Sequence, residues 1–99
     1  MRVKPEPDPD VEDEAPTSDS VTPYDEQHFI TYLRLLDAET DGANWTEVAR
    51  IVLHRDPDAE EIRTRRCWES HLARAHWMTA IGYRRILEQA RREHRSDPH

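Results

Sequence analysis

The sequence predicts an all-α protein, a small bundle of about four helices that contains a helix-turn-helix-like unit. Three observations support this fold class. Apolar residues recur at helical spacing between Phe29 and Leu87, helix-start and helix-end signals interrupt that pattern, and no stretch alternates as a strand would. The 99 residues are enough for one small domain.

The N-terminal part of the chain lacks this pattern and is predicted to be a disordered acidic tail. Residues 1–23 contain five of the seven prolines, no aromatic residue, and seven acidic against two basic side chains. Such a composition buries too little apolar surface to offset the entropy lost on ordering. We therefore expect a tail over residues 1–22, a helical domain over 23–94 and a flexible C-terminus over 95–99.

The first helix is predicted to begin after Thr22 and to end at Asp41–Gly42. Thr22 can cap its N-terminus, Pro23 suits the first helical position, and Asp25 adds an acid near the positive end of the helix dipole. Gly42 can adopt the left-handed conformation that often ends a helix. One apolar face is predicted from Phe29, Tyr32, Leu33 and Leu36.

A second, short helix is predicted from Trp45 to about His54. Asn44 can cap it, and Glu47 is placed to reach back to the cap. A third, longer helix is expected over residues 58–79, because Asp56–Pro57 is a helix-start signal.

Gly82 is expected to break the third helix, and a last helix follows with an apolar face made of Tyr83, Ile86, Leu87 and Ala90. The third helix divides into two sides. Its inner side is predicted to carry Trp68, Leu72, Ala75 and Thr79. Its outer side is predicted to carry Arg63, Arg66, Ser70, Arg74 and Trp77.

The three tryptophans differ in their neighbours. Trp45 and Trp68 have periodic apolar neighbours, so both are predicted to lie in the core. Trp77 shares its helix face with arginine and serine, which leaves two alternatives open. Either it folds under the last helix near Gly82, or it is an exposed anchor for a partner, since aromatic residues ringed by arginine are common binding hot spots.

No pattern in the chain indicates an enzyme, and we expect no catalytic residue, cofactor or metal ion. With only two glycines the chain has no glycine-rich phosphate loop. Cys67 and His71 share a helix face and could supply two zinc ligands or a nucleophile and its base. A structural zinc site needs four ligands, however, and nothing in the sequence supplies an oxyanion hole, so we expect an ordinary surface or partly buried pair.

Hydropathy and cysteine content predict a cytoplasmic protein without a membrane partner, and a chain this small has little room for a small-molecule pocket. The mean hydropathy is -1.02, and no stretch approaches the roughly 20 apolar residues of a membrane-spanning helix. No apolar segment follows the first residues, so no signal peptide is expected. The single cysteine suits a reducing compartment.

Two binding functions fit the charge pattern. The short second helix and the arginine-bearing third helix follow each other as in a helix-turn-helix, which would place Arg63, Arg65 and Arg66 against DNA. The net charge of -7 and the acids that precede these arginines would repel phosphate. We therefore expect a protein partner, and DNA is the less favoured one.

A resemblance sharpens this expectation. It is carried by the runs Tyr32–Asp37, Asn44–Leu53, Trp68–Ala75, Trp77–Thr79 and Gly82–Leu87. From Asp25 to Leu87 the chain resembles a bacterial domain-of-unknown-function family found in regulators of integrative and conjugative elements. The short, stand-alone form resembles quorum-sensing antiactivators of symbiosis islands.

The resemblance implies an antiactivator that binds transcriptional activators, namely a quorum-sensing regulator of the LuxR/TraR class and an excision activator. It would thereby repress excision and conjugative transfer of a mobile element. The alternative is a helix-turn-helix transcriptional repressor that binds DNA. In the preferred case the predicted partner-binding residues are Arg63, Arg66, Arg74, Trp77, Arg84 and Arg85.

Overall fold

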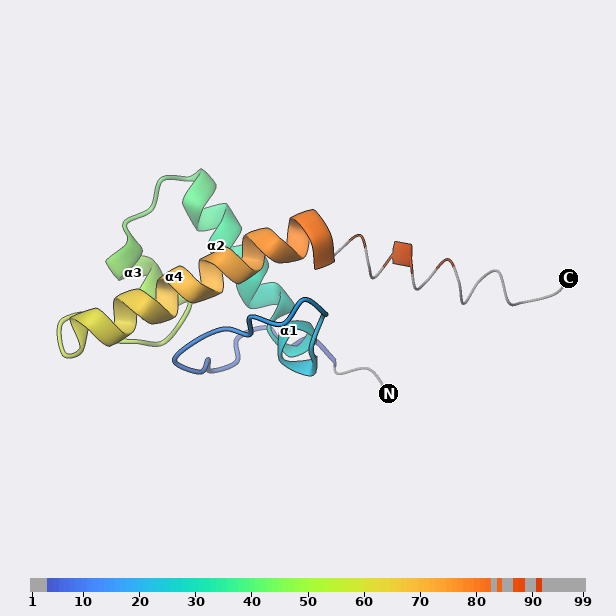
Figure 1. The fold of residues 1–99 in the computed structure, drawn as a ribbon. Coiled ribbons are helices and arrows are strands. Elements are labelled where there is room, and N and C mark those ends of the chain that lie inside the picture. Colours follow the sequence, from blue (N-terminus) through green and yellow to red (C-terminus); the bar gives the residue numbers. More distant parts are fainter. Residues whose placement is uncertain (1–3, 83, 85–86, 89–90, 92–99) are drawn as a thin grey trace, which may run out of the picture.

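The computed structural model describes residues 4–82, 84, 87–88 and 91, and this part of the chain is all-α without any strand. Its helices are α1 (Pro23–Gln27), α2 (Phe29–Thr40), α3 (Trp45–Ile51) and α4 (Glu61–Trp77), and a π-helical segment, η1 (Met78–Gly82), continues α4. Figure 1 shows α2 crossing α4, with α3 beside the N-terminal part of α4. The predicted fold class is confirmed.

The predicted first helix is in fact two helices, because the backbone leaves helical geometry at His28 (φ -100°, ψ 18°). Thr22 caps α1 as expected. Its hydroxyl accepts a hydrogen bond from the Asp25 amide at 3.2 Å, and the Asp25 carboxylate accepts one from the Thr22 amide at 2.8 Å. This reciprocal pair is a capping box, followed by Pro23 at the first helical position.

The end of α2 also follows the prediction. The amides of Gly42 and Ala43 donate to the carbonyl oxygens of Glu39 and Ala38, each at 3.0 Å. Gly42 has a φ of 71°, which a side chain would strain. Together these bonds form a Schellman motif that satisfies the last carbonyl groups of the helix.

The next two helices are shorter than predicted. Asn44 caps α3 by accepting a hydrogen bond from the Thr46 amide, but the helix ends at Ile51, three residues before His54. The expectation that Asp56 begins the long helix is wrong, because α4 starts only at Glu61. Asp56 instead accepts from the Asp58 amide and closes a turn, which joins the two helices.

The core lies between α2, α3, α4 and the connector before α4. Its buried apolar residues include Tyr32, Leu35, Val48, Val52, Leu53, Cys67, Ala75 and Met78. The expected face of α2 is rotated, since Leu33 is exposed and Leu35 is buried. The prediction that Trp45 and Trp68 are core residues is wrong in degree, because both are only half-buried.

The segment before α1 has no helix or strand, in keeping with its composition, but it lies against the helices. We call residues 8–15 the strap. Val11 and Ala15 of the strap are buried, and the Ala15 amide donates to Ser70 Oγ of α4 at 3.1 Å. These contacts with α4 were not anticipated from the sequence.

The predicted last helix falls mainly outside the described residues. Of its residues, Arg84, Leu87, Glu88 and Arg91 are described, and all four are helical. None of the helices that the structure describes has the length and apolar character needed to span a bilayer.

Candidate nucleic-acid interface

Exposed arginines gather on the N-terminal half of α4. Arg63, Arg65 and Arg66 are all exposed there, and they occupy the positions that the sequence predicts for contacts with DNA. A fourth arginine, Arg55, comes from the connector before α4 and is mostly covered. The fold thus brings together basic side chains from two segments of the chain.

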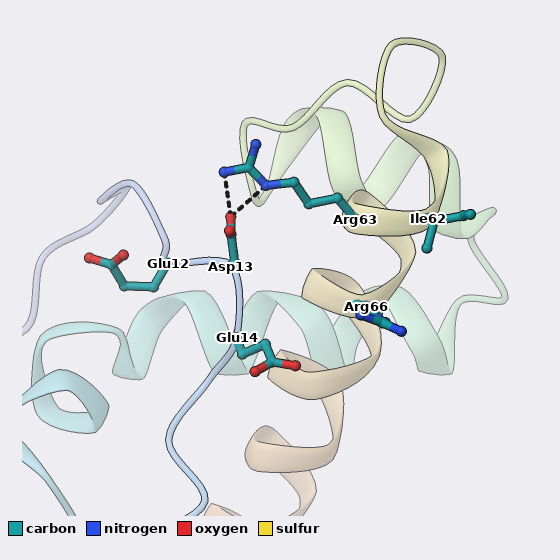
Figure 2. A pocket seen from close by; sticks show the side chains of 6 residues that line it. All are labelled: Glu12, Asp13, Glu14, Ile62, Arg63 and Arg66. Atoms are coloured by element: carbon teal, nitrogen blue, oxygen red, sulfur yellow. Dashed lines mark hydrogen bonds and ion pairs between the residues drawn. The ribbon is translucent and has the colours of Figure 1, made fainter.

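A carboxylate of the strap joins two of these arginines. Asp13 Oδ1 lies 2.7 Å from Arg55 Nη1 and 2.9 Å from Arg63 Nη2, and Figure 2 shows Arg63 turned toward it. Hydrogen bonds from Arg63 and Arg55 lower the pKa of Asp13, so this carboxylate is ionised at neutral pH. Arg63 also pairs with Glu60 at 3.0 Å.

The neighbouring part of the surface is an open depression of about 610 Å³ between the strap and α4 (Figure 2). It is lined by Glu12, Asp13, Glu14, Ile62, Arg63 and Arg66. In the described part of the chain, Arg66 forms no ion pair, and Ile62 is 75% exposed. The depression therefore combines a free cation with an exposed apolar side chain.

Arg65 lies on a separate face of α4, against the two half-buried tryptophans. Its guanidinium carbon is 4.9 Å from the Trp45 ring centroid and 5.1 Å from that of Trp68. The two indoles are themselves 5.9 Å apart. This stack ties α3 to α4 and leaves Arg65 partly exposed.

The prediction that Arg74 faces outward is wrong. Its side chain is 4% exposed and pairs with Asp25, which is fully buried, at 2.7 Å. Arg74 also donates to the carbonyl oxygens of Ser18 and Ser20, at 2.5 and 2.9 Å. Helical spacing predicts Arg74 on the same outer side as Arg66. In the structure the segment before α1 covers this turn of α4, so Arg74 is not part of an exposed surface.

Trp77 is half-buried and packs against the core, with the Arg74 guanidinium 3.8 Å above its ring. The structure thus favours packing over an exposed anchor. Arg84 is exposed and helical, whereas Arg85 lies outside the described residues.

Residues 9–88 match the family model of the RovC DNA-binding domain, described as "T6SS, Transcription factor, DNA binding domain". The chain belongs to this family. No curated protein matches it.

Membership in the RovC DNA-binding domain family assigns the chain to transcription regulation and to a family that is not enzymatic. It favours DNA as a partner, against the preference drawn from net charge. The match begins at residue 9, so it covers all of the strap except Asp8.

The RovC-type domain also contains a buried polar chain that the sequence did not suggest. Tyr24 Oη lies 2.6 Å from His71 Nε2, and His71 Nδ1 lies 2.7 Å from the Cys67 carbonyl oxygen. Because Nδ1 faces an acceptor, it carries the proton, and the Tyr24 hydroxyl donates to Nε2. Burial lowers the pKa of His71 to about 4, which keeps the ring neutral.

Cys67 Sγ is 3.7 Å from His71 Nδ1, but burial raises the pKa of the thiol. Both side chains are fully buried, so the expectation of a surface or partly buried pair is wrong. The described residues bring no three His, Cys, Asp or Glu side chains into a metal-binding group.

Sequence reasoning missed Arg55, Asp13 and His54 as parts of this surface. His54 bridges two strap carboxylates, with Nε2 2.9 Å from Asp8 Oδ1 and Nδ1 2.9 Å from Asp10 Oδ1. These carboxylates, the hydrogen bond to Asp10 foremost, raise the pKa of His54. The sequence signal for such contacts was charge complementarity: the strap is rich in acids, and the connector carries His54 and Arg55.

Proposed function

We propose that this chain is the DNA-binding domain of a transcriptional regulator and that the N-terminal half of α4 contacts the duplex. The observation that carries the proposal is the family match over residues 9–88. It is supported by the exposed arginines at Arg63 and Arg66, which are one helical turn apart on α4.

The geometry of α4 suits this role. It has 17 residues, follows α3 along the chain and packs on it, as a recognition helix follows the first helix of a helix-turn-helix. The connector over residues 52–60 is longer than the three or four residues of the usual turn. The unit is therefore helix-turn-helix-like in order, with an extended connector that supplies Arg55.

Electrostatics sets the strength of binding. The net charge of -7 and the carboxylates of the strap oppose the approach of a polyanion. Binding through Arg63 and Arg66 alone would be weak and would fall as salt is added, because each phosphate contact releases about one counterion from DNA.

Fluorescence anisotropy of the full chain with a labelled mixed-sequence duplex tests the proposal. Binding should be detectable at low salt and weaken as salt is added. The double variant Arg63→Gln, Arg66→Gln should bind more weakly, with a log–log salt slope smaller by about 1 per arginine.

Arg34→Gln is the control for loss of charge away from α4, because it removes one positive charge from α2, half of the change in the double variant. It should leave the slope nearly unchanged. Absence of binding at low salt would contradict the proposal, as would equal losses in the control and the double variant.

A second candidate is the antiactivator function implied by the resemblance to regulators of integrative and conjugative elements. Two features favour it: the half-exposed Trp45–Arg65–Trp68 stack, whose residue types are enriched in protein-binding hot spots, and the exposed apolar side chain of Ile62. The partners would be a LuxR/TraR-type regulator and an excision activator.

A tagged pull-down of the full chain, with and without nuclease, separates the two candidates. Recovery of a transcriptional activator that survives nuclease would favour the antiactivator function. Recovery of DNA, together with proteins that are lost after nuclease, would favour the DNA-binding function.

A further inference from the structure

A carboxylate of the protein itself sits among the basic side chains of the candidate interface (Figure 2). Asp13 Oδ1 is 2.7 Å from Arg55 Nη1, 3.0 Å from Arg63 Nε and 2.9 Å from Arg63 Nη2. Three nitrogen atoms from two arginines thus converge on one oxygen, and two of them, Arg55 Nη1 and Arg63 Nε, donate hydrogen bonds to it. Arginines hold phosphate oxygens with the same charge-assisted hydrogen bonds.

We propose that Arg55 and Arg63 form a binding site for a backbone phosphate of DNA, and that Asp13 occupies this site in the free protein. The inference rests on the proposed DNA-binding function and deepens it, because it names one phosphate contact and the group that competes for it.

The arginine pair is preorganised for an anion. Arg55 Nη2 donates to the Val11 carbonyl oxygen at 2.7 Å, which fixes the plane of the guanidinium while Nη1 points at the anion position. The Arg55 side chain is only 19% exposed, so it has little freedom to turn away. Arg63 approaches from α4, where the Glu60 carboxylate restrains it.

Asp13 is the exchangeable member of the cluster. Its side chain is 51% exposed, whereas Val11 and Ala15 on either side of it are buried. The strap backbone is also held between them, because the Glu12 amide donates to Tyr24 Oη at 3.0 Å. A phosphate can therefore replace Asp13 by rotation of one side chain, without release of the strap.

The energetics allow this exchange. Ion pairs between exposed groups contribute little, because solvent screens them and ordering both side chains costs entropy. A phosphate of duplex DNA also brings the entropy of counterion release, which a single carboxylate does not. At low salt a DNA phosphate therefore competes successfully with the Asp13 carboxylate for the two arginines, and it competes less well as salt is raised.

The test compares two single variants of the full chain, each of which removes one negative charge from the strap. Asp13→Asn removes the carboxylate that faces Arg55 and Arg63. Glu14→Gln is the matched control, because Glu14 is adjacent and forms no ion pair with an arginine in the described part of the chain. Both are titrated against a labelled mixed-sequence duplex at low salt.

We expect Asp13→Asn to bind the duplex roughly three- to fivefold more tightly than the unmodified chain, the range set by one or two exposed ion pairs. The duplex affinity of Glu14→Gln should stay within about twofold of that of the unmodified chain, since this change alters only the long-range electrostatic field, which salt screens. Adding Arg63→Gln to Asp13→Asn should remove the gain. Equal effects of the two single variants, or no gain in Asp13→Asn while the unmodified chain binds, would overturn the proposal.

A second readout does not depend on DNA. Inorganic phosphate is titrated into the labelled full chain while the side-chain Nε–H resonances of Arg55 and Arg63 are followed by NMR. In Asp13→Asn these resonances should shift at lower phosphate concentration than in the unmodified chain. If no variant binds DNA but this shift occurs, the phosphate site stands and the DNA-binding function fails. If the shift is equally absent in both proteins, the site itself is refuted.

Discussion

Two aspartate–arginine contacts tie the N-terminal part of the chain to the helices, and they differ in almost every property except their chemistry. Asp25 and Arg74 are 0% and 4% exposed, whereas Asp13 and Arg63 are 51% and 52% exposed. The buried pair also has a full set of hydrogen bonds, since Asp25 accepts from Tyr32 Oη at 2.8 Å and from the Thr22 amide.

The difference decides what each pair can do. A buried charge that loses its partner has no water to replace it, so Asp25–Arg74 is a permanent part of the fold. An exposed pair exchanges with solvent and with other ions at little cost, so Asp13–Arg63 is suited to exchange with a phosphate. The same residue types thus give structure at one end of α4 and a candidate binding site at the other.

Removal of Arg74 is expected to have the largest effect. Arg74→Met leaves Asp25 buried and unpaired, which should lower the free energy of unfolding by about 3–5 kcal/mol. Urea unfolding followed by helical circular dichroism measures this. Arg66→Met is the control on an exposed part of the same helix and should change the value by less than about 0.5 kcal/mol. A loss of stability for Arg74→Met as small as that of the control would show that the buried Asp25–Arg74 pair is not more important to the fold than an exposed arginine.

Acid should destabilise the protein through His71. Its pKa in the folded state is about 4, below the value of about 6.5 in the unfolded chain. The unfolded state therefore binds the proton first, and stability that is complete above pH 6.5 falls as the pH drops toward 4. The loss should be on the order of 3 kcal/mol. Urea unfolding at successive pH values measures it.

Other groups act in different pH windows. Burial alone would raise the pKa of Asp25, but hydrogen bonds from Arg74, Thr22 and Tyr32 lower it, so its contribution is lost only below the unfolded value near 3.9. His54, with a raised pKa, contributes below the unfolded value and loses its contribution as the pH rises above it. A stability profile that is flat between pH 6.5 and 4 would contradict the neutral, buried His71.

The stack on α3 should give an intermediate effect. Arg65→Gln removes the guanidinium from the faces of Trp45 and Trp68, and we expect a loss of about 0.5–1 kcal/mol. Tryptophan fluorescence during urea unfolding reports on it directly. An unchanged emission spectrum and midpoint would show that the stack does not hold α3 on α4.

Asp13→Asn should have the smallest effect on the fold. Since the pair is exposed and screened by solvent, we expect the free energy of unfolding to stay close to that of the unmodified chain. Thermal unfolding of this variant beside Glu14→Gln measures the difference. A loss comparable to that of Arg74→Met would show that the strap depends on this ion pair and that Asp13 is not exchangeable.

Local signals in the sequence predicted much of the fold. The Thr22 and Asn44 caps and the Gly42 helix end are short-range chemistry, and all three were confirmed. The break at His28 and the late start of α4 were missed. The residues at both places are compatible with a helix, so the local sequence does not show where the helix is interrupted or begins.

The candidate site was predictable only in part. Arg63 and Arg66 were found from their spacing on one helix. Arg74 has the same spacing, and only the segment that covers it, more than 50 positions away in sequence, makes it a buried residue. The pairing of Asp13 with Arg55 is equally non-local, and composition alone described the strap as an acidic tail.

The most direct test of the comparison is an NMR titration of the labelled full chain with duplex DNA at low salt. The account predicts that resonances of Asp13, Arg55, Arg63 and Arg66 change, while those of Asp25 and Arg74 stay in place. Changes centred on Asp25 and Arg74, or none in the N-terminal half of α4, would contradict it.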